Sequence, residues 1–281
     1  MQDIYEEVMK IKAEGKSAAL ATIISTKGST PREVGAKMLI QEDGKILGTI
    51  GGGCMEAEVW QEAMKVMAEE TPRTIHLDLT GKQAEESGMI CGGVMDIYIE
   101  PLVPPPRVFI FGGGHISLFV ARMSAMVGFQ VVVVDDRPQF ANKERFPEAE
   151  EVIAEEFPLA LPKLKVNKSS YLVIVTRGHS YDQEVLEWAV STEARYIGMI
   201  GSRKKIQTVY QGMEEKGIPA VKFKRVHAPI GLNIGALTPE EIAVAIVAEM
   251  IAEKRKIKGE KQESDFPFHR RNPICHGMGQ I

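Results

Sequence analysis

Two cysteines in the first hundred residues stand beside runs of glycine: Cys54 follows Gly51, Gly52 and Gly53, and Cys91 precedes Gly92 and Gly93. A glycine turn that leads into a helix presents backbone N–H groups at the positive end of the helix dipole, which suits a phosphate. The same field lowers the pKa of a thiol, and the resulting thiolate is a nucleophile and a soft metal ligand. The pattern predicts an anion-binding turn with a sulfur- or metal-handling Cys54. The alternative is a tight turn that carries a small buried cysteine.

Cys91 stands at the entry to a predicted strand, where the two glycines alone would favour a β-bulge. A shared site with Cys54 becomes the better interpretation if the two residues meet in space. The loop of residues 27–37 adds Arg32 and Lys37 among turn-forming residues. Arg32 is suited to a bidentate grip on a phosphate or a carboxylate, and its alternative is an exposed loop charge.

A second glycine turn, in residues 112–114, follows a predicted strand and opens a predicted helix at His115. Gly112 and Gly114 occupy two positions of the dinucleotide-binding fingerprint, and Ser117 occupies the third glycine position. With His115, the two glycines are candidate cofactor-binding residues. Asp135 lies 23 residues after Gly112, at the end of the next strand, where a ribose-binding acid is expected. The pattern predicts the fold, but it predicts the use of a cofactor less directly.

Basic residues follow two further predicted strands: Arg177 and His179 after the first, and Arg203 after the second. The carboxyl ends of parallel strands form the edge where open α/β sheets bind ligands. We expect these three side chains to converge on one anionic ligand, although each alone would be an ordinary loop residue. His227 is a further candidate, with a capping or turn role as its alternative.

The pattern of apolar residues predicts an α/β fold, with a small α+β module followed by a Rossmann-like parallel-sheet domain. In the first part, the predicted elements are helices over residues 3–14 and 54–70, strands over 18–26 and 94–100, and a hairpin of strands 38–40 and 46–50. In the second part, continuous apolar strands over 108–111, 130–134, 171–175 and 196–200 alternate with helices over 115–127, 182–190 and 203–216. A last helix starts at Thr238, which forms a predicted capping box with Glu241.

These elements define four segments of the chain. We expect an N-terminal domain over residues 1–100, a proline-rich linker over 101–106, the Rossmann-like domain over 107–255 and a charged tail over 256–281. Proline lacks an N–H and fixes φ, so we expect the proline-rich run to lie outside any sheet or helix.

Composition excludes several classes of protein. The chain has 281 residues, 44% of them hydrophobic and 26% charged, with a net charge of −4, which gives no overall attraction to nucleic acid or membrane. Three cysteines without zinc-ligand spacing, and an acidic N-terminus without a signal peptide, predict a cytoplasmic protein.

Several motifs in fixed order resemble the XdhC/CoxI family, the xanthine dehydrogenase accessory factors. They are residues 48–56 (GTIGGGCME), 31–32 with 35–38, 91–93, 112–115, 135–138 (DDRP), 176–179 (TRGH), 201–204 (GSRK), 228–232 (APIGL) and 238–243 (TPEEIA). The resemblance covers about residues 1–255, so Cys275 inherits no role from it.

The resemblance implies a chaperone that binds the molybdenum cofactor, supports its sulfuration by a cysteine desulfurase and delivers it to a molybdenum hydroxylase. It also implies a homodimer, and a cofactor-maturation factor rather than a dehydrogenase. The cofactor carries a phosphate, a dithiolene and a metal, so the glycine turn would suit the phosphate while Cys54 or Cys91 contacts sulfur or molybdenum. The Rossmann-like half would bind the pterin, its nucleotide-bearing form or a dinucleotide.

Two other functions stay open from the sequence alone. The first is an NAD(P)-dependent oxidoreductase that uses Gly112, Gly114 and Asp135, although no hydride-transfer site stands out. The second is a redox or metal-binding dithiol protein, which requires the Cα atoms of Cys54 and Cys91 to lie within about 7 Å of each other.

Overall fold

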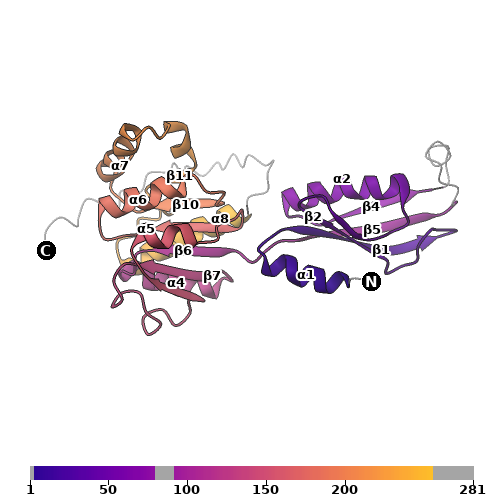
Figure 1. Cartoon of the computed structure of the whole chain (residues 1–281), viewed down its shortest axis with the longest axis horizontal. Helices are drawn as coiled ribbons and strands as arrows, with labels where there is room; N and C mark the ends of the chain where they lie inside the picture. The colour runs from indigo at the N-terminus through magenta and orange to yellow at the C-terminus, as the bar shows by residue number, and fades with distance from the viewer. Residues whose placement is uncertain (1–2, 80–91, 256–281) are drawn as a thin grey trace. The chain divides into compact units, whose positions relative to one another are not determined.

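The computed structural model describes residues 3–79 and 92–255. The chain divides into two compact units, Met1–Pro104 and Pro105–Ile281 (Figure 1).

The N-terminal unit is built on a five-stranded antiparallel sheet with the strand order β3-β2-β1-β5-β4. Its strands are β1 (Ala18–Lys27), β2 (Lys37–Gln41), β3 (Ile46–Gly48), β4 (Arg73–Asp78) and β5 (Val94–Leu102), and its helices are α1 (Ile4–Ala13) and α2 (Gly53–Glu69). The predicted hairpin is present, because β2 and β3 pair around the turn at Gly44.

The two helices cover opposite faces of this sheet (Figure 1). Along β1, Ala19, Ala21 and Ile23 belong to the core under α2, whereas Ala18 and Leu20 belong to the core under α1. This alternation follows from the period of two in a strand, which sends successive side chains to opposite faces. The sheet therefore carries two separate hydrophobic cores.

The proline-rich run departs from its prediction at its first two residues. Pro101 and Leu102 belong to β5 and lie opposite Ala19 and Ala18 of β1. The expectation that the run lies wholly outside a sheet was therefore wrong. Pairing between β5 and β4 ends at Ile99, so one edge of β5 is open at Pro101, and an open edge tolerates a residue without an N–H.

The C-terminal unit is built on a six-stranded parallel sheet with the order β11-β10-β9-β6-β7-β8. Its strands are β6 (Arg107–Phe111), β7 (Gln130–Asp135), β8 (Glu151–Ala154), β9 (Ser170–Ile174), β10 (Tyr196–Met199) and β11 (Val226–His227). Its helices are α4 (His115–Met126), α5 (Phe157–Ala160), α6 (His179–Ala189), α7 (Arg203–Glu215) and α8 (Pro239–Arg255), with 3₁₀ turns at Leu161–Lys163 and Ala220–Arg225. Strand order reverses between β6 and β9, which is where a Rossmann-type sheet opens its crevice.

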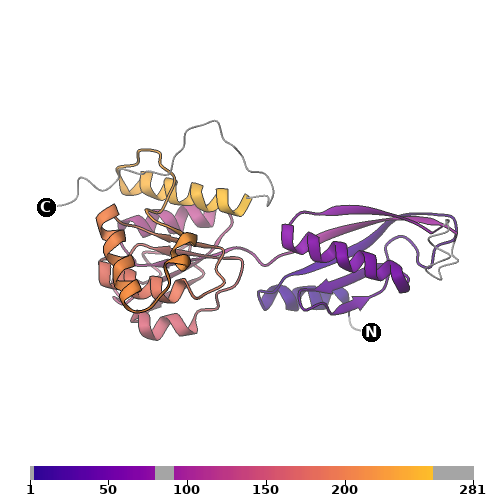
Figure 2. The ribbon, with the colours of Figure 1, turned by 90° about the horizontal axis from the view of Figure 1, so that it is seen from above.

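Alternate residues of each central strand again serve two cores. Val108 and Ile110 of β6 pack under α4 and α8, and Phe109 and Phe111 pack under α6 and α7. Figure 2 shows α8 lying beside α4 over one face of the sheet, and the two helices are in contact. The predicted fold class, a small α+β module followed by a Rossmann-like parallel sheet, is confirmed.

The capping box at the start of α8 is also confirmed. The backbone N–H of Glu241 donates to Thr238 Oγ1 at 3.3 Å, and that of Thr238 donates to Glu241 Oε2 at 3.1 Å. Helix α6 begins three residues earlier than expected, at His179 rather than Asp182.

Candidate functional site

The glycine run before α2 adopts a backbone that only glycine takes without strain. Gly51, Gly52 and Gly53 have φ values of 139°, 86° and 67°. Gly52 is the N-cap residue of α2, and no side chain caps the helix there. Cys54 follows in the first turn with its side chain exposed, so the cysteine stands at the helix start that the sequence predicted.

The Glu56 side chain accepts hydrogen bonds from backbone N–H groups of this turn. Its Oε1 accepts hydrogen bonds from Thr49 Oγ1 at 2.5 Å, from the Gly52 N–H at 3.0 Å and from the Ile50 N–H at 3.2 Å. Burial raises the pKa of Glu56, but these bonds outweigh it and lower that pKa below its ordinary value. The sequence reasoning assigned no role to Glu56, although an acid in the first helical turn after a glycine run is a signal for this contact.

One loop of the N-terminal unit contacts both glycine runs. A Cβ placed on Gly51 would lie 2.5 Å from Pro31 Cγ, and a Cβ on Gly93 would overlap the carbonyl oxygen of Ser29. The loop of residues 28–31 therefore joins the turn before Cys54 to the glycines that follow Cys91. Cys91 itself lies outside the described residues, so its distance from Cys54 stays a prediction.

The two basic residues predicted in this region differ in their surroundings. Arg32 is exposed and directly follows Pro31, and its carbonyl oxygen accepts a bond from Thr30 Oγ1 at 3.0 Å. Lys37 is half-buried on β2, and its Nζ donates to Thr22 Oγ1 at 3.1 Å. Arg32 is thus the better placed of the two to meet a ligand from solution.

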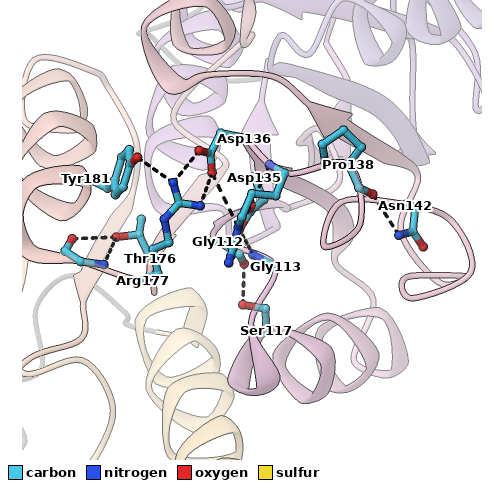
Figure 3. A network of polar contacts seen from close by, with 12 residues as sticks. Gly112, Gly113, Ser117, Asp135, Asp136, Pro138, Asn142, Thr176, Arg177 and Tyr181 are labelled. Carbon is cyan, nitrogen blue, oxygen red and sulfur yellow. Dashed lines mark hydrogen bonds and ion pairs between the residues drawn. The ribbon is translucent and has the colours of Figure 1, made fainter.

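In the C-terminal unit, Asp135 is buried and binds two residues of this chain, one of which is Gly113 of the second glycine turn (Figure 3). It accepts from the Gly113 N–H at 2.7 Å, from the Arg137 N–H at 3.0 Å, and from Arg137 Nε and NH2 at 2.9 and 3.0 Å. Burial raises the pKa of Asp135, but these donors outweigh it and lower the pKa below its ordinary value. The residue is therefore a carboxylate at neutral pH, and its charge is neutralised within the protein.

Arg177 is also engaged by neighbouring side chains (Figure 3). Its guanidinium binds both carboxylate oxygens of Asp136, at 2.9 and 2.7 Å, and donates to the Tyr181 hydroxyl at 2.6 Å. The guanidinium also stacks on the Tyr181 ring, 4.5 Å from its centroid. Hydrogen bonding to Asp136 and then to Tyr181 raises the pKa of Arg177.

The other basic residues predicted for this edge lie where expected in the sheet. His115, His179 and Arg203 are the exposed first residues of α4, α6 and α7. These helices follow β6, β9 and β10, which are adjacent in the sheet. The three residues therefore begin helices at the carboxyl edge of the sheet. The convergence of Arg177, His179 and Arg203 on one anionic ligand stays a prediction, and Arg177 is bound to Asp136.

An ion pair with a buried carboxylate joins the first turns of α6 and α7. Asp182 is fully buried, accepts from Thr176 Oγ1 at 2.6 Å and forms an ion pair with Lys205. Burial raises the pKa of Asp182, and the contacts with Lys205 and Thr176 oppose that rise without cancelling it. Sequence reasoning missed this pair, because the two residues lie in different motifs.

His227 belongs to a second polar cluster on the α8 side of the sheet. Glu249 of α8 accepts from the Tyr196 hydroxyl at 2.6 Å and from the Gly231 N–H at 2.8 Å, and its other oxygen lies 3.1 Å from His227 Nδ1. Burial raises the pKa of Glu249, but His227 and Tyr196 outweigh it and lower that pKa. The cluster anchors the chain after β11 to α8.

Metal clusters and membrane-spanning helices are both missing from the described residues. Within residues 3–79 and 92–255, no group of three or more His, Cys, Asp or Glu side chains is arranged to hold a metal ion. Over the same part of the chain, no helix is long and apolar enough to cross a membrane.

Comparison with known families gives two matches. The model of the XdhC Rossmann domain matches residues 108–250, and that of the XdhC and CoxI family matches residues 11–78. Together they span the two glycine turns described above.

Three curated proteins are similar to this chain. Uncharacterized protein YqeB of Escherichia coli (strain K12) is 34% identical over 99% of the chain, and the chain spans about half of its length (51%). A probable xanthine dehydrogenase subunit of Bacillus subtilis (strain 168) is 24% identical over 86% of the chain and 94% of that protein. The molybdenum cofactor insertion chaperone PaoD of E. coli (strain K12) is 19% identical over 89% of this chain and 89% of that protein.

Proposed function

Because the chain belongs to the XdhC and CoxI family, we propose that it binds the molybdenum cofactor and delivers it to a molybdenum hydroxylase of the xanthine dehydrogenase type. Two relatives support this proposal by name. One is a molybdenum cofactor insertion chaperone, and the other is a probable xanthine dehydrogenase subunit, and each aligns with most of this chain. In this role the chain is a maturation factor rather than a dehydrogenase.

The observation that carries the proposal is that one loop of the N-terminal unit packs against both glycine runs and lies beside Arg32 and the turn before Cys54. The loop of residues 28–31 packs against Gly51 on one side and Gly93 on the other, and it leads directly to the exposed Arg32. Cys54 stands exposed in the first turn of the helix that follows Gly51. A basic side chain and a thiol on adjoining turns suit a ligand with a phosphate at one end and sulfur and a metal at the other.

Each residue has an assigned part in this proposal. Cys54 contacts the sulfur or the molybdenum of the cargo, and Cys91 contributes a second thiol. Glu56 uses the N–H groups of Ile50 and Gly52, so we assign the phosphate to Arg32 rather than to those amides. Lys37 supports the same region through its contact with β1.

We also propose the partner, the oligomeric state and the cellular compartment in which this chain works. A cysteine desulfurase supplies the sulfur while the cofactor is bound, the working form is a homodimer, and transfer takes place in the cytoplasm. In the C-terminal unit, His115, His179 and Arg203 are assigned to anionic groups of the cargo or of the client.

Client maturation tests this function. An apo-enzyme of the xanthine dehydrogenase type is incubated anaerobically with molybdenum cofactor, a desulfurase and this chain, and the activity that develops is measured. Wild type should raise the yield of active enzyme, and Cys54→Ala should lower that yield without changing the unfolding transition. Equal yields with Cys54→Ala and wild type would remove the role of Cys54, and equal yields with and without the chain would remove the function.

A further inference from the structure

The fold of the C-terminal unit is one that binds a dinucleotide in many proteins, at the point where strand order reverses. Such a site needs an acid with open acceptor positions for the ribose and a glycine turn whose backbone the pyrophosphate can approach. In this chain the acid would be Asp135 and the turn would be residues 112–114.

Asp135 has no acceptor position left for a ribose. A carboxylate offers about four positions, and four donors already fill them. Oδ1 accepts from the N–H and Nε of Arg137, and Oδ2 accepts from Arg137 NH2 and from the Gly113 N–H. Asp135 is also 3% exposed, so a diol would have to displace a charged, stacked arginine to reach it.

The middle glycine of the turn is covered by this chain's own backbone. A Cβ on Gly113 would lie 2.5 Å from the carbonyl oxygen of Phe140 and 3.2 Å from its Cβ. The carbonyl oxygen of Gly113 accepts from Arg145 NH2 at 3.1 Å, and its N–H is donated to Asp135. Phe140 therefore covers Gly113, the residue between the two fingerprint glycines, whereas a Cβ on Gly114, the second fingerprint glycine, would meet nothing within 4 Å.

The first glycine is closed in the same way. A Cβ on Gly112 would lie 2.6 Å from the carbonyl oxygen of Val175. Its N–H donates to the carbonyl of Val134 at 2.8 Å, and its carbonyl accepts from the buried Ser117 Oγ at 2.5 Å (Figure 3). The absence of a side chain at Gly112 and Gly113 is thus explained by close packing within the protein.

The covering segment is a packed part of the fold. The N–H groups of Phe140 and Ala141 both donate to the carbonyl of Arg137 at 2.9 Å, and the Arg137 guanidinium lies 3.7 Å above the Phe140 ring. Phe146 is fully buried in the core under α4, which fixes the far end of the segment.

An ion pair crosses the remaining space above the turn. Asp136 follows β7, Arg177 follows β9, and β6 lies between these strands. The bidentate pair between Asp136 and Arg177 therefore spans the carboxyl end of β6 (Figure 3). A dinucleotide would have to break this pair as well.

We infer that the C-terminal unit does not hold NAD or NADP with Asp135 as the ribose-binding acid, because this chain's own Arg137 occupies Asp135 and Phe140 covers Gly113. The turn then packs the end of β6 against residues that follow β7 and β9. Gly112 and Gly113 therefore matter for folding in the absence of any ligand.

Two experiments on the full chain test this inference. In the first, wild type is titrated with NADH and NADPH by fluorescence and with NAD by calorimetry. No saturable binding is expected up to about 1 mM, the upper end of ordinary cofactor and substrate constants. Saturable binding below that concentration that Asp135→Asn abolishes would overturn the inference.

The second experiment compares two neighbouring glycines without ligand. Gly113→Ala should lower the melting temperature by about 5 °C or more, because the added methyl group meets the Phe140 backbone. Gly114→Ala is the matched control, since a Cβ there meets nothing within 4 Å and φ is −72°; a change of about 2 °C or less is expected. A wild-type melting temperature for Gly113→Ala would overturn the packing role. If that variant fails to fold, the titration of wild type still decides.

Discussion

Replacing Glu56 should loosen the turn that presents Cys54. One oxygen of Glu56 accepts the Thr49 hydroxyl and two backbone N–H groups, at 2.5 to 3.2 Å. A hydrogen bond to a charged group contributes about 1.5–3 kcal/mol, but these three share one half-buried oxygen and their donors can turn to water. We therefore expect Glu56→Ala to lower the free energy of unfolding by about 2 kcal/mol, and Glu56→Gln by about 1 kcal/mol.

Tryptophan fluorescence can report on the N-terminal unit alone. The chain has two tryptophans, Trp60 on α2 and Trp188 on α6, so Trp188→Phe leaves a single reporter close to Glu56. In urea, a loss of about 2 kcal/mol shifts the midpoint by about 1 M for a typical slope. Glu58→Ala, an exposed residue two positions along the same helix, is the control and should shift it little.

The pH dependence gives an independent check on Glu56. Its pKa is lower in the folded protein than its ordinary value of 4.5, so its contribution is complete at neutral pH and is lost as pH falls through the folded pKa. The stability difference between wild type and Glu56→Gln should therefore shrink below about pH 4.5. Equal midpoints for Glu56→Ala and Glu58→Ala at pH 7 would refute the reasoning.

Three further pairs of substitutions test the C-terminal unit through Trp188 fluorescence in urea, in a Trp60→Phe background. Thr238→Ala should lower the free energy of unfolding by about 1 kcal/mol through loss of the capping box, whereas Thr238→Ser should change it little. Glu249→Ala should cost about 3 kcal/mol, more than Tyr196→Phe, because it leaves the buried Tyr196 hydroxyl without its acceptor. Lys205→Met should lower the free energy of unfolding by about 3 kcal/mol at pH 7, because it leaves the Asp182 carboxylate buried without its ion-pair partner. The loss should be smaller at pH 5, because burial raises the pKa of Asp182 and protonation removes its charge. An equal loss at both pH values would contradict the last expectation, and Lys204→Met is its control.

Local signals in the sequence predicted much of the fold. The apolar run of β6, the glycine turn after it and the capping box of α8 each depend on residues within a few positions of one another. Strands β4, β8 and β11 were missed, since β4 is a half-exposed edge strand and β11 has only two residues. Their place depends on the neighbouring strand rather than on their own pattern.

The site could be predicted less completely, for a physical reason. Asp135 has the same residue type and spacing whether a ribose or Arg137 binds its carboxylate, and the contact with Arg137 depends on how the chain turns after β7. The same holds for Glu56, which uses N–H groups that the sequence assigned to a phosphate. Polar groups near a glycine turn are thus predictable as a set, but their partners are not.

Anaerobic equilibrium binding of isolated molybdenum cofactor to the full chain tests the central claim most directly. Wild type should bind the cofactor tightly, Cys54→Ala should weaken binding by about tenfold or more, equivalent to about 1.4 kcal/mol, and Cys275→Ala should bind as wild type does. Absence of binding to wild type, or equal binding by Cys54→Ala, would contradict the assignment of the Cys54 turn to the cofactor.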